Sequence, residues 1–212
     1  MTPKRTLSCT LAAALLLLPG LAVLAGDDEA ARSKQELDAF RAYLKKEYPD
    51  KKWQQGPTRL DSAALRAAYR EQRFYYVYSS PPLPPGANIK SVQEAHRRRV
   101  EDIRKNYVSL TVRIDAKGQI VPLRLPQDYN GGLMKVASDE DARTAAAAIL
   151  SLRECAHVAP VAVDPKNIAV TQSNKGWSCE AKGKGFFRGT VTFDAAGQCT
   201  AVSKFYAGPF PP

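Results

Sequence analysis

A thirteen-residue pattern that occurs twice constrains the fold of this chain more than any other feature. Residues 190–202 read TVTFDAAGQCTAV and residues 111–123 read TVRIDAKGQIVPL, at a constant offset of 79 residues. In both copies, β-branched and aromatic residues alternate up to Asp-Ala-Lys/Ala-Gly. The Asp of such a turn can cap its own backbone, and the Gly can adopt the left-handed conformation of a bulge. Each copy therefore predicts a β-hairpin.

The turn also predicts which residues face each other across each hairpin. When the Asp and the Gln at the base of the turn are paired, Ile114 faces Ile120 in the first copy, and Phe193 faces Cys199 in the second. These pairs mark the predicted buried face, because facing side chains on one face pack together. Pro122 cannot donate a backbone hydrogen bond, so its strand is predicted to be an edge strand or to carry a bulge.

An alanine-rich helix is predicted between the two hairpins. Ser138 is followed by three acidic residues, which are favourable in a first helical turn, and Ala145 and Ile149 begin a buried stripe. The predicted fold class is α+β. It consists of an antiparallel sheet built from two related β-hairpins (about 107–125 and 186–205), packed against the alanine-rich helix (about 139–157), with N-terminal helices alongside.

The first 25 residues have the pattern of a secretory signal peptide. Lys4 and Arg5 precede an apolar run at 11–18, and small residues precede a predicted cleavage after Ala25. Cys9 lies before the apolar run, which argues against a lipoprotein signal, and the run is too short for a retained anchor. The mature chain is therefore predicted to be periplasmic or secreted, with no transmembrane segment.

The segment after the signal is predicted to be mainly helical. Ser33 and Glu36 form a capping box for one helix, and Asp61 is the expected cap of a second. The aromatic run at 74–78 predicts a strand, although tyrosines beside arginines could also stack on sugar rings or bases. The predicted units are a signal peptide at 1–25, a helical segment at 26–85 that ends in a Pro-rich connector, and an α+β domain at 86–212, which could form one domain with 26–85.

The charge balance indicates an anionic partner without identifying it. Removing Lys4 and Arg5 from the 31 basic residues leaves 29 against 21 acidic residues, a net charge of +8. The densest group, Arg97, Arg98 and Arg99, lies in a predicted helix, where successive side chains point about 100° apart. If an anionic envelope component is the partner, these arginines are the predicted binding residues, although a solvated basic surface is the simpler explanation of the charge.

Three cysteines remain after the signal is removed, so one disulfide and one free thiol are expected. Cys199 occupies the position of Ile120 in the first hairpin and can serve as a small buried hydrophobe. A bond between Cys155 and Cys179 is therefore predicted, with Cys179–Cys199 as the alternative. A zinc site that adds His157 to the three cysteines lacks a Cys-x-x-Cys pair, and no metal or other cofactor is predicted.

The chain contains neither a Gly-x-Ser-x-Gly nor a His-Glu-x-x-His motif, and it has only two histidines. We therefore expect a non-catalytic accessory or binding protein of the envelope or extracellular space, which engages an anionic component or a protein. One alternative is an envelope- or glycan-directed hydrolase that uses carboxylates such as Asp128, Asp164 or Glu180. Another is a secreted inhibitor-like protein binder. Nucleic acid is not expected as a partner, because export separates the protein from it.

Overall fold

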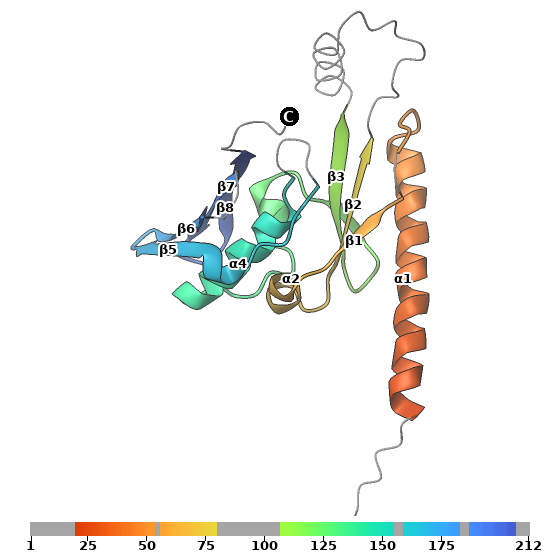
Figure 1. Ribbon diagram of the computed structural model, residues 1–212, viewed down its shortest axis with the longest axis horizontal. Coiled ribbons are helices and arrows are strands. Elements are labelled where there is room, and N and C mark those ends of the chain that lie inside the picture. The colour runs from red at the N-terminus through yellow and green to blue at the C-terminus, as the bar shows by residue number, and fades with distance from the viewer. Residues whose placement is uncertain (1–19, 54–55, 80–106, 155–158, 183–186, 207–212) are drawn as a thin grey trace, which may run out of the picture.

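The computed structural model describes residues 20–53, 56–79, 107–154, 159–182 and 187–206 (Figure 1). The elements follow one another as α1 (Gly20–Glu47), β1 (Thr58–Leu60), α2 (Ala63–Ala68), β2 (Arg73–Ser79), β3 (Val108–Ile114), β4 (Ile120–Pro122), the 3-10 helix η1 (Pro126–Tyr129), α4 (Asp139–Leu152), the 3-10 helix η2 (Pro165–Asn167), β5 (Ile168–Ser173), β6 (Gly176–Lys182), β7 (Phe187–Asp194) and β8 (Cys199–Tyr206).

These elements form four layers. α1 lies along one face of the sheet β1-β2-β3-β4, and α2 and α4 cover the other face (Figure 1). The second sheet, β5-β6-β7-β8, lies on the far side of α4. All neighbouring strands are antiparallel, so the α+β class predicted from the sequence is confirmed.

The two related hairpins lie in separate sheets, which corrects the expectation of a single sheet. The first hairpin is β3–β4 and the second is β7–β8. In each case the first strand of the hairpin also pairs with the strand before it in the chain: β3 pairs with β2 along its whole length, and β7 pairs with β6 from Arg188 to Asp194. The first strand of each hairpin is therefore already paired on both sides, and α4 lies between the two sheets.

The turns of the two hairpins have the same geometry, as the repeat predicted. The Asp115 carboxylate accepts hydrogen bonds from two backbone N–H groups of its own turn, each at 2.9 Å. The Asp194 carboxylate does the same at 3.0 and 2.9 Å. Gly118 and Gly197 both have φ of 79°, the left-handed conformation that favours glycine.

The predicted pairing across each hairpin is also confirmed. Ile114 pairs with Ile120, and Phe193 pairs with Cys199 next to a bulge in the β7–β8 ladder. Pro122 lies in β4, which is an edge strand of the first sheet, so the missing N–H of proline leaves no ladder bond unmade.

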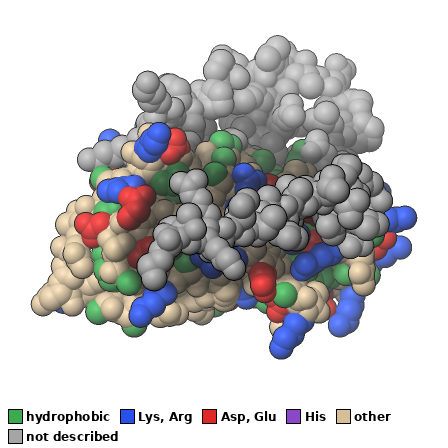
Figure 2. Space-filling view, turned by 90° about the horizontal axis from the view of Figure 1, so that it is seen from below, with side chains coloured by type: hydrophobic (Ala, Val, Ile, Leu, Met, Phe, Trp, Pro, Cys, Tyr) green, Lys and Arg blue, Asp and Glu red, His purple; other side chains and the backbone are tan. Residues whose placement is uncertain are grey.

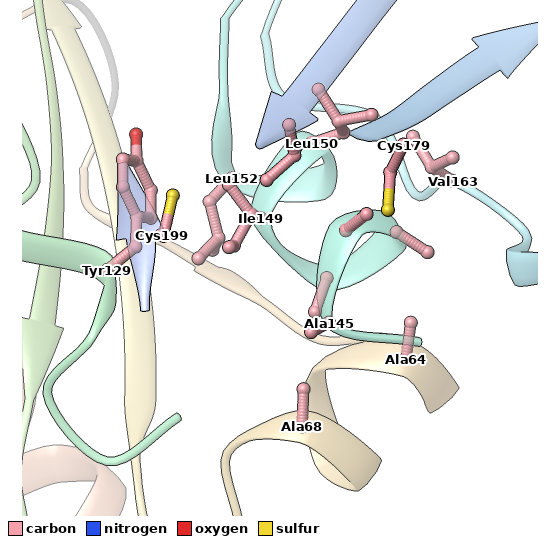
Figure 3. Close-up of a cluster of buried hydrophobic side chains, with 14 of the residues drawn as sticks. Ala64, Ala68, Tyr129, Ala145, Ile149, Leu150, Leu152, Val163, Cys179 and Cys199 are labelled. Carbon is pink, nitrogen blue, oxygen red and sulfur yellow. The ribbon is translucent and has the colours of Figure 1, made fainter. Parts of the chain in front are cut away.

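α4 is the centre of the larger hydrophobic core. Its residues from 145 to 152 are almost completely buried, because the helix packs against α2 and the first sheet on one side and against the second sheet on the other (Figure 3). The alanines allow this close approach on both sides. Ser138 caps the helix start by accepting a hydrogen bond from the Asp141 N–H at 3.2 Å. α4 ends at Leu152, earlier than the predicted 157, because Arg153 is extended.

The second, smaller core lies between α1 and the first sheet. Phe40 and Leu44 of α1 pack against Tyr75 and Val77 of β2, and all four are buried. The prediction that a capping box at Ser33 starts this helix was wrong, since α1 is already helical from Gly20. The stretch before Ser33 is rich in helix-forming residues, and the helix continues through it.

Two further points concern the N-terminal part of the chain. The short helix α2 is capped by Ser62, whose hydroxyl accepts from the Leu65 N–H at 3.1 Å. The prediction that Asp61 is the cap was wrong, since Asp61 forms an ion pair with Arg66.

The segment 26–85 contributes β1 and β2 to a sheet that β3 and β4 complete. Within the described ranges, none of the helices combines the length and the apolar character that crossing a bilayer requires.

Candidate functional site

A row of aromatic side chains runs from the end of α1 into the loop that follows it. The ring centroids of Phe40 and Tyr43 are 6.3 Å apart, those of Tyr43 and Tyr48 6.4 Å, and those of Tyr48 and Trp53 5.7 Å. The last two contacts are edge-to-face, an arrangement that aromatic rings favour. Phe40 is buried, whereas the other three rings are half-buried. The row therefore presents aromatic surface to solvent from a fixed position.

Opposite this row lies the segment between β4 and η1. The Asp128 carboxylate accepts hydrogen bonds from the backbone N–H groups of Arg124 at 2.9 Å and Leu125 at 2.7 Å. These bonds hold the chain in a tight turn before η1. The Leu125 side chain is 53% exposed, which makes it one of the few large apolar side chains that point to solvent in the described part of the chain.

The two segments enclose an open groove of about 600 Å³, which we call the α1–β4 groove. This volume falls within the range of about 300–1,000 Å³ that is typical of small-ligand sites. The groove is lined by aromatic, aliphatic and charged residues in similar numbers: Tyr43, Glu47, Tyr48, Val121, Pro122, Arg124, Leu125 and Asp128. Its chemistry is therefore that of a mixed polar and apolar binding surface.

Arg124 joins the two walls of the groove. Its guanidinium donates a hydrogen bond to the Tyr48 hydroxyl. Among the residues that the structure describes, no carboxylate lies within ion-pair distance of the Arg124 guanidinium, and the side chain is exposed. A guanidinium carries five N–H donors, so Arg124 retains capacity to bind a ligand oxygen.

Tyr43 is a neutral donor and acceptor in the groove at physiological pH. Burial raises the pKa of Tyr43, and the nearby Tyr48 and Glu47 raise it further, whereas Arg124 lowers it. The Tyr43 hydroxyl therefore keeps its proton and can both donate and accept a hydrogen bond.

The arginines predicted to bind an anionic partner, Arg97, Arg98 and Arg99, lie outside the described residues, and their role stays a prediction. On the face drawn in Figure 2, the Lys and Arg side chains of the described residues are interspersed with Asp and Glu and do not form a basic patch. The mixture agrees with the diffuse charge read from the sequence.

The predicted disulfide also involves a residue outside the described part of the chain. Cys155 is not described, so its bond to Cys179 stays a prediction. Cys179 and Cys199 are both buried and are not bonded to each other, so the alternative disulfide is not formed. Burial raises the pKa of the Cys179 thiol to about 12 and that of Cys199 to about 11. Over the described ranges, no group of three His, Cys, Asp or Glu residues could hold a metal ion.

The three acids considered for a hydrolase lie on different elements. Asp128 belongs to η1 and lines the α1–β4 groove, whereas Asp164 caps η2 by accepting the Lys166 N–H at 2.9 Å. Glu180 lies in β6. Only Asp128 is part of the groove, where the second carboxylate comes from Glu47.

Sequence reasoning missed the groove because its walls come from distant segments. Tyr43 and Tyr48 lie near the end of α1, and Arg124 lies 76 residues after Tyr48. A partial signal was present, since Tyr43 falls beside the Phe40–Leu44 stripe of the helix and is therefore only half-buried.

No family model, curated protein or solved structure gives a significant match to this chain.

Proposed function

We propose that this chain is an exported, non-catalytic binding protein that engages a component of the cell envelope through the α1–β4 groove. Export is supported by the basic, apolar and small-residue regions of the first 25 residues. Binding is supported by one observation above all, the half-exposed aromatic row that faces Arg124 across an open groove. Aromatic surface with a few fixed polar groups is the usual composition of a ligand site.

Hydrolysis of a glycan is the second candidate, because two carboxylates line the groove. A glycosidase needs one of its two carboxyl groups protonated, which usually requires an apolar environment. Asp128 instead accepts two backbone N–H groups through its carboxylate. The Glu47 side chain is 44% exposed and lies 3.5 Å from the Lys46 ammonium. Neither environment resembles that of a general acid, so we favour binding without turnover.

The first experiment tests export and envelope binding together. The full chain is expressed with its own N-terminus in a bacterial host, and the intact mass of the exported protein is measured. We expect a chain that starts at Gly26. The purified protein is then incubated with isolated peptidoglycan sacculi and sedimented, and we expect it to pellet with the sacculi without releasing soluble sugar.

The groove is tested with the variants Tyr48→Ala and Arg124→Ala, which we expect to remain in the supernatant. Arg188→Ala is the matched control, because Arg188 is an exposed arginine on β7 in the other sheet. Pelleting that is the same for all four proteins would contradict the assignment of the groove. Release of reducing sugar that Asp128→Asn abolishes would replace the binding function with the hydrolase. A chain that stays inside the cell at full length would contradict export.

A further inference from the structure

We infer that the α1–β4 groove takes a neutral glycan segment, with a sugar ring stacked on Tyr48 and flanked by Tyr43. This inference rests on the proposed function, since it names the ligand class of the same groove. Three properties of the lining residues support it: their charge, the position of their aromatic rings and the distribution of apolar and hydrogen-bonding groups.

The charge of the lining argues against an anionic ligand. The groove contains one cation, Arg124, and two carboxylates, Glu47 and Asp128. An anion placed beside Arg124 would also lie near like charges, which is unfavourable. An uncharged ligand avoids this repulsion. The same charged groups can still hydrogen-bond to hydroxyl groups, because a carboxylate accepts and a guanidinium donates.

The aromatic rings suit the C–H face of a sugar ring. Tyr43 and Tyr48 meet at an interplanar angle of 62°, and Trp53 meets Tyr48 at 85°. Each ring is thus held by its neighbour before a ligand arrives, so little side-chain entropy is lost on binding. The half-buried rings offer an apolar surface to the C–H face of a sugar. The Tyr48 hydroxyl accepts from Arg124 and can still donate its own proton to a sugar hydroxyl.

The remaining lining favours sugars that carry a small apolar substituent. Pro122 and Leu125 provide apolar surface beside the polar groups, and Leu125 is 53% exposed. The methyl group of an N-acetyl substituent would remove part of this surface from water, while its carbonyl could accept a hydrogen bond from Arg124. We therefore name N-acetylhexosamine oligomers as the ligand class.

Trp53 allows the binding to be followed by fluorescence. The chain has two tryptophans, Trp53 and Trp177, and Trp177 is buried in the larger core, where its indole N–H donates to Asp139 at 3.0 Å. The variant Trp177→Phe leaves Trp53, next to Tyr48, as the single reporter. The probes are tri-N-acetylchitotriose, which is neutral, and trigalacturonic acid, which is anionic and equal in length.

We expect saturable fluorescence changes with the neutral trimer and at least tenfold weaker binding of the anionic one. Tyr48→Ala should weaken binding of the neutral trimer about tenfold or more, the usual effect of removing a stacking ring. Tyr48→Phe keeps the ring and should retain most of the affinity, and Arg188→Ala should bind as the parent does. Circular dichroism confirms that each variant is folded.

The outcomes separate this inference from the proposed function. If sacculi pellet the protein in a Tyr48-dependent manner but the neutral trimer does not bind, or the anionic trimer binds as tightly, the ligand class is wrong and the binding function stands. If neither the trimers nor the sacculi bind, both proposals fail. Binding of the neutral trimer that is unchanged in Tyr48→Ala would place the sugar elsewhere and overturn the inference.

Discussion

The side-chain amide of Asn130 pairs with the backbone of Cys199 in the way that a neighbouring strand would. Its oxygen accepts the Cys199 N–H at 2.7 Å, and its nitrogen donates to the Cys199 carbonyl at 3.2 Å. Cys199 is the first residue of β8, an edge strand, and it lies beside the bulge of the β7–β8 ladder. The loop after η1 thus covers the start of an edge that would otherwise expose unpaired groups.

Replacing Asn130 by alanine should lower the free energy of unfolding by about 1–3 kcal/mol, because a partly buried donor and acceptor lose their partners. Asn130→Asp keeps the acceptor for the Cys199 N–H, so its free energy of unfolding should lie between those of the parent and of Asn130→Ala. Urea unfolding measures the change. Gln127→Ala is the control, since the Gln127 side chain is exposed on η1. Equal stability of Asn130→Ala and the parent would show that solvent replaces both bonds.

The duplicated turns allow a matched pair of substitutions. A Cβ at Gly118 would meet nothing within 4 Å, whereas one at Gly197 would lie 2.4 Å from the Val136 carbonyl oxygen. Gly118→Ala should cost about 1–2 kcal/mol, the penalty of a left-handed alanine. Gly197→Ala adds a steric clash and should cost at least about 1 kcal/mol more. Urea unfolding of the two variants checks this, and equal losses would contradict it.

The buried thiols predict a loss of stability in alkali. Burial raises the pKa of Cys199 to about 11, so the folded protein holds its proton. Burial raises the pKa of a Cys179 thiol to about 12, and this group adds to the effect when it is not bonded to Cys155. Unfolded thiols release theirs near pH 8.5. Between about pH 9 and pH 11 the unfolded state therefore binds fewer protons, and the free energy of unfolding falls as the pH rises. Urea unfolding across this range measures the slope.

Cys199→Val provides the control for this pH dependence, because it places an aliphatic residue where the first hairpin has Ile120. We expect a change of less than about 1.5 kcal/mol at pH 7, as for other volume-conserving substitutions, together with a shallower alkaline slope. In the folded parent, iodoacetamide at pH 8 should leave Cys179 and Cys199 unmodified, as peptide mapping would show. Rapid labelling of either thiol would contradict its burial.

Glu36 should anchor α1 to the first sheet. It is 7% exposed, accepts the Tyr75 hydroxyl at 2.9 Å and lies 3.0 Å from the Arg32 guanidinium. Glu36→Ala should cost about 1.5–3 kcal/mol, because a hydrogen bond to a charged group is lost. The control is Asp38→Ala, which removes the exposed pair with Arg41 on the same helix and should cost less than about 1 kcal/mol. Similar losses for both would argue against this anchor.

The local parts of the fold could be predicted from the sequence. The two turns follow from Asp and Gly at fixed positions, and the aromatic run at 74–78 does form β2. The number of sheets could not be predicted in this way. It depends on which strand pairs with β3 and which with β7 on the side away from the hairpin partner. Backbone hydrogen bonds are the same for every residue type except proline, so the sequence does not specify these partners.

The candidate groove was out of reach for a related reason. The residues with conspicuous chemistry in the sequence were arginines in a run and cysteines, and neither group forms the groove. Arg124 belongs to the groove because it donates a hydrogen bond to the Tyr48 hydroxyl, and Asp128 holds the turn before η1 by accepting from two backbone N–H groups. The contact between Arg124 and Tyr48 arises only after α1 has docked on the sheet that ends in β4.

The strands of the two sheets differ in how far apart they lie along the chain, and this difference affects the order in which the sheets form. β5 to β8 are neighbours along the chain and pair with little loss of chain entropy. β2 and β3 are separated by a longer stretch of sequence, from Ser79 to Val108, so their pairing costs more chain entropy. If the protein is exported as proposed, its N-terminus crosses the membrane first. The aromatic strand β2 then stays unpaired, and exposed to aggregation, until β3 has followed it across the membrane.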